Sequence, residues 1–265
     1  MGLIDTHTHL DGFDRARTLP AVLTRARAAG VEAMIAIGTA PDDWTLNQGY
    51  ARGNPGWVHY TVGLHPCEVT ADWESAQAQV AGFWSGDLMP VALGEIGLDR
   101  FHLPTEAAEA EIVFARQKAA FTEGLALAKR LDCPVVIHSR GAFAECVAMI
   151  DASSVDWRKI VFHCFAEGEA EAKVLMGRGG FASFTGILTY KNAPNVCAAA
   201  KAQGLARLMV ETDAPYLTPM PNRGKPNEPA FVRHTAEFAA AEVFGVSYDE
   251  LAAVTTANAR KFFGL

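Results

Sequence analysis

The sequence has little cysteine and no long apolar run. Its five cysteines show no paired spacing, which disfavours a zinc knuckle or a disulfide framework and indicates reduced thiols. No apolar segment reaches the length of a membrane span, and the first residues hold no basic and apolar export signal. These absences predict a cytoplasmic protein without a membrane partner, and nothing in the sequence indicates an obligate protein partner.

Positive charge is also scarce. The 23 Lys and Arg residues are outnumbered by 30 Asp and Glu residues, which gives a formal net charge of −7. Proteins that coat long nucleic acids need broad basic surfaces to displace counterions, so the composition argues against that class and leaves room only for a small, locally positive site. Half of the 265 residues are hydrophobic, and we expect residues 1–265 to form a single domain with a large core.

The chain contains eight short, mostly apolar segments that alternate with helical patterns. Strands are predicted at 3–11, 31–39, 58–64, 90–96, 135–137, 160–162, 181–187 and 208–210. Helices are predicted at 18–30, 42–52, 73–84, 104–131, 143–150, 168–176, 196–202, 230–244 and 249–263. Eight such units predict a single α/β domain of the (β/α)8 TIM-barrel type. The alternative, an open doubly wound sheet, would favour a glycine-rich loop after the first strand, where this chain has His-x-His.

Metal-ligating side chains collect at the ends of the predicted strands. His7 and His9 are two residues apart on the first strand, so they point the same way and could bind one cation; the alternative is two solvated histidines on an edge strand. Polar residues follow later strands at His65, Glu95, His138, His163, Glu211 and Asp213. Singly, each could be a hydrogen-bonded strand end or a helix cap. In a barrel they would share one face, where so many buried ionisable groups would be costly without a metal.

Seven motifs extend the pattern along nearly the whole chain. They are DTHTHLD (5–11), VGLHP (62–66), GEIGLD (94–99), IHSR (137–140), FHCF (162–165), ETDAPYL (211–217) and RGKPNEP (223–229). With these motifs the sequence resembles the TatD-type metal-dependent hydrolases, often described as deoxyribonucleases, within the amidohydrolase-like superfamily of barrels. The resemblance implies two divalent metals. One would be held by His7, His9 and Glu95 with Asp213 beside it, and the other by Glu95, His138 and His163.

The ligand types fit that implication. Two histidines and a carboxylate leave a divalent ion with open positions, which marks a catalytic site. Glu95 has two oxygens and could bridge two ions, since the fourth strand has no lysine to be carbamylated. Two divalent cations would carry four positive charges, and the carboxylates Glu95 and Asp213 carry two negative charges. The remaining positive charge suits an anionic substrate. Zinc fits the mixed ligands best, with manganese, iron, nickel or magnesium as alternatives.

We therefore predict a metal-dependent hydrolase of phosphodiester bonds, with Glu95 and Asp213 as catalytic residues. In this hypothesis Asp213 orients a metal-held water or accepts its proton, and the resulting hydroxide attacks phosphorus. The substrate would be DNA ends or short single-stranded DNA, cut by an exonuclease. One alternative is amidohydrolase-type hydrolysis of an amide, a lactone or a nucleobase amine on the same centre, because one fold serves many reactions. The other alternative is a protein that binds metal without catalysing a reaction.

Five further residues are predicted to contact substrate or to support a ligand. His65 would contact the phosphate or a metal-held water, or hold a ligand in place. Glu211 would orient a ligand; its alternative is an ion pair with a buried arginine. Arg140, Arg223 and Lys225 would bind phosphate, and the alternative is a solvated charged loop.

The match to the family pattern is incomplete at two places. Arg100-Phe101-His102 follows Gly-Leu-Asp where the family often has aromatic residues, especially tyrosine. Ser139-Arg140-Gly141 stands where it often has Thr-Arg-Asp. Both departures leave substrate preference open.

Overall fold

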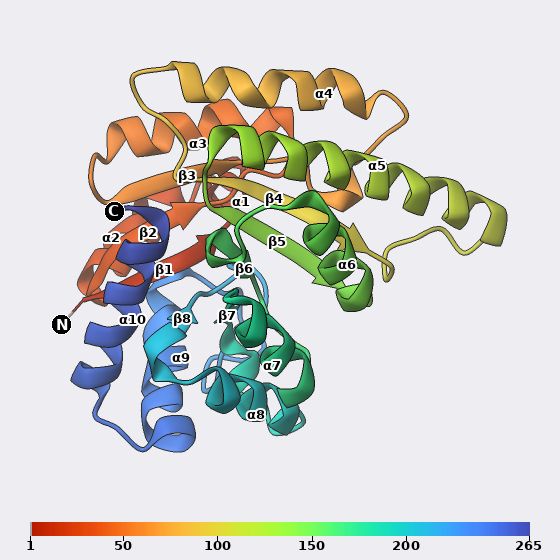
Figure 1. The fold of residues 1–265 in the computed structure, drawn as a ribbon. Coiled ribbons are helices and arrows are strands. Elements are labelled where there is room, and N and C mark those ends of the chain that lie inside the picture. The colour runs from red at the N-terminus through yellow and green to blue at the C-terminus, as the bar shows by residue number, and fades with distance from the viewer. Residues whose placement is uncertain (1) are drawn as a thin grey trace.

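Eight parallel strands close into a barrel surrounded by helices, which confirms the predicted (β/α)8 fold (Figure 1). The computed structural model describes residues 2–265. The strands pair in chain order: β1 (Leu3–Thr8), β2 (Val31–Ala36), β3 (Val58–Val62), β4 (Ala92–Asp99), β5 (Val135–Arg140), β6 (Ile160–Phe162), β7 (Phe181–Phe184) and β8 (Met209–Val210). A parallel bridge between Thr8 and Ala214 brings the chain after β8 back beside β1.

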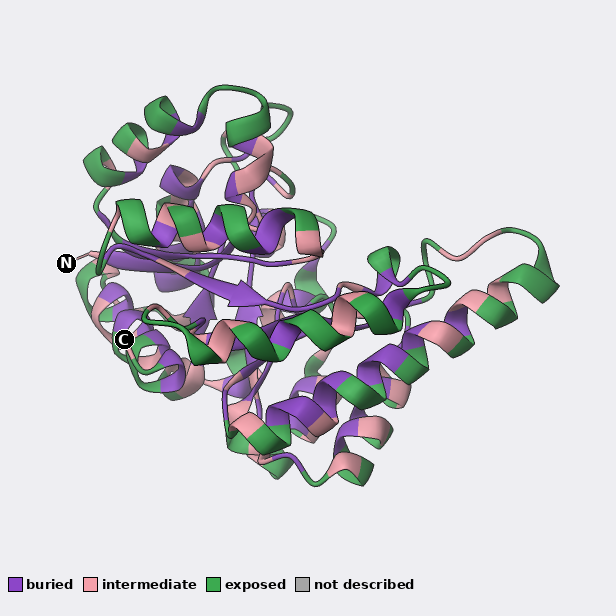
Figure 2. Cartoon of the chain, turned by 90° about the horizontal axis from the view of Figure 1, so that it is seen from above, coloured by how far each residue is buried: buried purple, intermediate pink, exposed green. Residues whose placement is uncertain are grey.

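The helices cover the outside of the barrel and turn their exposed faces to solvent, whereas the strands are buried (Figure 2). They are α1 (Leu10–Arg15), α2 (Leu19–Ala28), α3 (Pro41–Gly53), α4 (Trp73–Val80), α5 (Ala107–Leu131), α6 (Phe143–Ser153), α7 (Glu169–Arg178), α8 (Pro194–Gln203), α9 (Val232–Phe238) and α10 (Tyr248–Phe263). The length of α5 follows from its many good helix formers, Ala, Glu, Leu and Lys. No helix in residues 2–265 combines the length and the apolarity needed to cross a membrane.

Several predicted boundaries were wrong. The first strand ends at Thr8 rather than at residue 11, because the buried pair Leu10 and Phe13, three residues apart, anchors the unpredicted helix α1. The fourth strand continues to Asp99 because it stays paired with β5. The seventh strand stops at Phe184, and a 3-10 turn follows at Gly186–Thr189. In the region predicted as helix 230–244, the chain forms α9 and then a π-helical segment.

An apolar layer inside the barrel supports the ends of the strands. Val136, Val161 and Met209 belong to one small buried cluster, which also contains Phe262 and Phe263 of α10. Side chains two positions further along a regular strand lie on the same face and nearer its carboxyl end. Residues 138, 163 and 211 therefore continue the inner face of β5, β6 and β8 at the mouth of the barrel.

Two strands depart from this regular alternation. The register between β1 and β2 shifts between Asp5 and Thr8, and the register between β4 and β5 shifts between Leu93 and Ile96. Residues 7 and 95 lie within these shifted stretches. Bulges of this kind re-aim side chains and are common beside active sites.

Candidate metal centre

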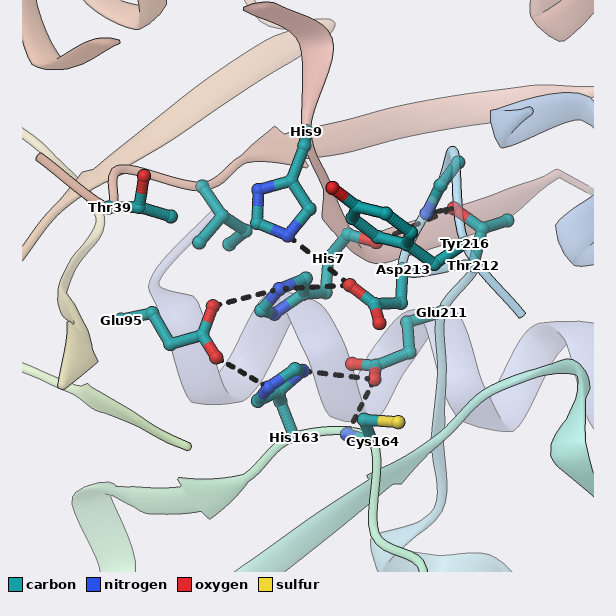
Figure 3. A network of polar contacts seen from close by, with 12 residues as sticks. His7, His9, Thr39, Glu95, His163, Cys164, Glu211, Thr212, Asp213 and Tyr216 are labelled. Carbon is teal, nitrogen blue, oxygen red and sulfur yellow. Dashed lines mark hydrogen bonds and ion pairs between the residues drawn. The ribbon is translucent and has the colours of Figure 1, made fainter. Parts of the chain in front are cut away.

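Glu95 lies at the centre of a cluster of imidazoles at the mouth of the barrel (Figure 3). Its Oε2 atom is 3.3 Å from His7 Nε2. Its Oε1 atom is 2.7 Å from both His163 Nε2 and His138 Nδ1. The carboxylate is 2% exposed, and its two oxygens face different histidines. This arrangement is the one that a carboxylate bridging two cations requires.

The first group of candidate ligands comes from β1, β4 and the segment after β8. One ligand atom each of His7, His9 and Glu95 lies within 4.8 Å of the others. Asp213 Oδ1 adds an oxygen 3.2 Å from His9 Nε2 and 3.6 Å from His7 Nε2. The backbone N–H of Asp213 donates to the carbonyl oxygen of His7, which fixes this carboxylate beside β1.

The second group lies on the other side of Glu95. His65, Glu95 and His138 offer ligand atoms within 4.8 Å of one another, and His163 reaches the same Glu95 oxygen. Gly97 permits this close approach of β4 to β5, because a Cβ atom there would lie 1.9 Å from the carbonyl oxygen of His138. His65 accepts a hydrogen bond at Nδ1 from the backbone N–H of Cys67, so the neutral ring carries its proton on Nε2, 3.1 Å from His138 Nδ1.

The residues present fit a pair of divalent cations. Both ring nitrogens of His7 are buried, and neither has a hydrogen-bond partner within the described chain. An imidazole buried without partners is costly, and a cation at Nε2 would satisfy it. The surrounding donors are imidazole nitrogens and carboxylate oxygens, a set that suits first-row divalent metals.

The charge states also suit metal binding. Burial alone would raise the pKa of Glu95, but His163, His65 and His7 hold it well below its usual range. Burial would likewise raise the pKa of Asp213, and its hydrogen bond from His9 lowers it. Burial lowers the pKa of His65 to about 3 and also lowers that of His7. The carboxylates are therefore ionised and His7 is neutral, as ligands must be, and the His65 imidazole is neutral as well.

Glu211 contacts the ring of His163 and accepts hydrogen bonds from the segment after β6 and from β7. Its Oε1 accepts a hydrogen bond from the backbone N–H of Cys164 at 2.6 Å and lies 3.5 Å from His163 Nδ1. Its Oε2 accepts from the hydroxyl of Ser183. From this position Glu211 can orient the ring of His163. The alternative interpretation required an ion pair with a buried arginine, and no arginine is among the partners of Glu211 in the described residues.

The three basic residues predicted to bind phosphate lie outside the ligand cluster. All three are exposed: Arg140 is the last residue of β5, and Arg223 and Lys225 lie on the segment that follows β8. Arg140 lies over the ring of Phe101 and Arg223 over that of Tyr190. None of the three belongs to a candidate ligand group in the described residues, and their binding of phosphate stays a prediction.

Two buried carboxyls near the ligands were quoted in motifs but given no role from the sequence. Asp5 accepts hydrogen bonds from the backbone N–H and the hydroxyl of Thr212, which ties β1 to the segment that carries Asp213. Burial raises the pKa of Asp5 to about 8. Asp99 Oδ2 accepts a hydrogen bond from His138 Nε2 at 3.0 Å. The signal for both was their place in the same short motif as a candidate ligand, Asp5 with His7 in DTH and Asp99 with Glu95 in GEIGLD.

A cavity of about 640 Å³ lies at the other end of the barrel. Its charged lining residues are engaged with neighbours, as Arg158 is with Asp156 and Lys159 with Asp132. At the Glu95 cluster, by contrast, buried ring nitrogens of His7 and His163 have no hydrogen-bond partner in the described chain.

Comparisons with known proteins agree with this geometry. The profile of the family described as TatD related DNase matches residues 4–264. The chain is 36% identical over 266 residues to an uncharacterized metal-dependent hydrolase, YcfH of Escherichia coli K12, covering 99% of this chain and 96% of that protein. It is 34% identical over 251 residues to a Cronobacter sakazakii protein named 3'-5' ssDNA/RNA exonuclease TatD, covering 91% and 90% of the two chains. The crystal structure of YJJV, a TatD homologue from E. coli K12, superposes with a TM-score of 0.87 at 27% identity, covering 99% of this chain and 98% of that one.

Proposed function

The chain belongs to the TatD family of metal-dependent hydrolases, and from this premise we propose that it hydrolyses phosphodiester bonds at the ends of single-stranded DNA. The observation that carries the proposal is the rim of the metal centre, where exposed guanidinium groups lie on aromatic rings. The Cζ atom of Arg140 is 4.0 Å from the ring centroid of Phe101, and that of Arg223 is 3.8 Å from the centroid of Tyr190. Guanidinium groups bind phosphate and aromatic faces stack on bases, so the rim offers both contacts that a polynucleotide needs.

Tyr216 adds an aromatic surface beside the candidate ligands. Its side chain is 61% exposed, and its ring centroid is 6.1 Å from that of His9 (Figure 3). The backbone N–H of Tyr216 donates to the carbonyl oxygen of Asp213, so the backbone at Tyr216 has a fixed place beside that residue. A base stacked on Tyr216 would bring its phosphate toward His9 and Asp213. The name of the Cronobacter sakazakii relative supports single-stranded DNA as substrate and a free 3′ end as the point of attack.

In this proposal each residue of the cluster has a defined task. His7, His9, Glu95 and Asp213 would hold one divalent cation, and Glu95, His138 and His163 would hold the other. Bound divalent ions supply Lewis-acid chemistry, lowering the pKa of water and neutralising charge on phosphate.

Two side chains then act on the substrate and the attacking water. Asp213, ionised and 14% exposed, accepts the proton of the attacking water at a carboxylate oxygen. His65 is neutral and holds its proton on Nε2, where it can donate a hydrogen bond to a phosphate oxygen.

The decisive experiment uses short single-stranded DNA with the 3′ end, the 5′ end or neither end blocked, in the presence of zinc, manganese or magnesium. We expect stepwise release of mononucleotides from an open 3′ end and protection by a 3′ block. Asp213→Asn should abolish the release while metal content is retained. Arg158→Ala, at the far end of the barrel, is the matched control and should cut normally. Turnover of amides or lactones without any cleavage of DNA would favour the amidohydrolase alternative instead.

A further inference from the structure

Next to the metal centre, three chemically different ligand groups converge at a place that the proposed reaction does not use. Cys67 Sγ lies 3.8 Å from Asp99 Oδ2, and His102 Nδ1 lies 2.8 Å from the same oxygen. All three ligand atoms are within 4.8 Å of one another. Cys67 is exposed and the His102 side chain is 51% exposed, whereas Asp99 is fully buried. A thiol, an imidazole and a carboxylate thus meet where solvent can deliver an ion.

From this juxtaposition we propose that Cys67, Asp99 and His102 form a third divalent-cation site, selective for zinc-like ions that accept sulfur and nitrogen ligands. Zinc binds sulfur at about 2.3 Å and nitrogen or oxygen at about 2.0 to 2.2 Å in tetrahedral geometry. Tetrahedral ligand atoms at those distances are separated by about 3.3 to 3.6 Å. The observed separations of 2.8 and 3.8 Å bracket that range, so small side-chain rotations suffice. The fourth position opens to solvent.

The buried carboxylate of Asp99 is already set in place for this task. Its Oδ1 atom accepts hydrogen bonds from the backbone N–H groups of Phe101 and His102, at 2.7 and 2.8 Å. Its backbone N–H donates to Gln117 Oε1. These bonds hold the carboxylate through Oδ1 and the backbone, whereas Oδ2 faces Cys67, His102 and His138. The site needs only the thiolate of Cys67 and the unprotonated Nδ1 of His102 to complete it, and a dianionic ligand set balances a divalent charge.

The third site shares an atom with the metal centre. Asp99 Oδ2 also accepts the hydrogen bond from His138 Nε2, and the Nδ1 atom of His138 faces Glu95. A cation that draws on Oδ2 weakens this hydrogen bond, and hydrogen bonds of this kind raise the basicity of a histidine ligand. Occupancy of the third site would therefore loosen the cation held by His138. This consequence rests on the proposed metal centre, whereas binding at the third site does not.

The test is metal binding by the full-length chain after its metals are removed with a chelator. Equilibrium dialysis against zinc, followed by elemental analysis, should give three ions for the wild type and two for Cys67→Ala and for His102→Ala. With cobalt(II), the thiolate absorption band in the near ultraviolet should appear in the wild type and vanish in Cys67→Ala. Cys197→Ala, which removes a half-buried thiol on α8, is the matched control and should keep the third ion and the band.

A second measurement follows Cys67 directly. Zinc should slow its alkylation by about tenfold, because a coordinated thiolate is withheld from the reagent. Equal zinc stoichiometry in the wild type, Cys67→Ala and His102→Ala, with no sulfur band, would overturn the third site. If instead the wild type bound one ion with a sulfur band that Cys67→Ala removed, the third site would stand and the binuclear centre would fall.

Discussion

Asp99 accepts a hydrogen bond from Nε2 of His138 at 3.0 Å, while the opposite ring nitrogen of His138 points at Glu95 from 2.7 Å. The carboxylate thereby holds the proton on Nε2 and leaves Nδ1 to face the position of a cation. Although burial lowers the pKa of His138, its hydrogen bonds to Asp99 and Glu95 raise it overall. A histidine ligand oriented by a buried carboxylate is a recurrent arrangement in metal sites.

Replacing Asp99 by Asn should weaken metal binding at the His138 side of the centre. The amide keeps the shape of the carboxylate but loses its charge, so we expect about a 10- to 100-fold loss of affinity for one cation. Competition with a chromophoric chelator measures that affinity, in the Cys67→Ala background so that loss of the third site does not contribute. Glu145→Gln removes a surface carboxylate that pairs with Arg100 and should leave it unchanged. Unaltered affinity in Asp99→Asn would show that His138 does not depend on Asp99.

Variants of Glu95 and Asp213 should separate an effect on metal binding from an effect on catalysis. Glu95→Ala removes the carboxylate that contacts four imidazoles, so the variant should lose both bound metal and activity. Asp213→Asn should retain metal on its other ligands and lose about 10²- to 10⁴-fold in kcat, the usual contribution of a proton-transfer group. Elemental analysis beside single-turnover rates distinguishes the two. Turnover near the wild-type level in a metal-loaded variant of either residue would refute the assigned role.

The basic rim predicts a salt dependence of substrate binding. Arg223→Ala and Arg140→Ala should each flatten the slope of log affinity against log salt by about 0.7, the value for one phosphate contact on a single strand. Arg223→Lys keeps the charge and loses the planar fork, so it should restore the slope but not all of the affinity. Fluorescence anisotropy of a labelled oligonucleotide on the inactive Asp213→Asn background provides the measurement. Slopes identical to that of the parent would place these arginines outside the DNA path.

Asp43 on α3 should make stability depend on pH. Burial raises its pKa from 3.8 to about 6, although hydrogen bonds from Thr39 oppose the shift. Because the folded state binds this proton more tightly than the unfolded chain, the contribution of Asp43 to stability is greatest at or below pH 4 and declines as the pH rises to about 6. Relative to Asp43→Asn, the wild type should lose on the order of 3 kcal/mol between pH 4 and pH 7.

Urea unfolding of the two proteins at several pH values measures that difference, in which the other titrating groups cancel. Asp43 is 3% exposed and belongs to no candidate ligand group, so metal content should stay the same in both proteins. A constant difference between the two unfolding free energies across this range would contradict the assignment.

The sequence alone determined the alternation of strands and helices and the order of the candidate ligand residues along the chain. Hydrophobic periodicity determines which face of a regular strand is buried, and this was enough to anticipate that His138, His163 and Asp213 share one end of the barrel. Helix α1 was missed because its six residues are too short for a periodic signal.

Tertiary structure alone decided how those side chains meet. His7 and Glu95 lie on stretches where the strand register shifts, so simple alternation does not determine where they point. The contact of His65 with His138 and the sharing of Asp99 between His138 and His102 join residues on different strands or loops. Periodicity is a local property of the chain, whereas these contacts depend on how the barrel closes, and closure sets the distances between atoms far apart in sequence.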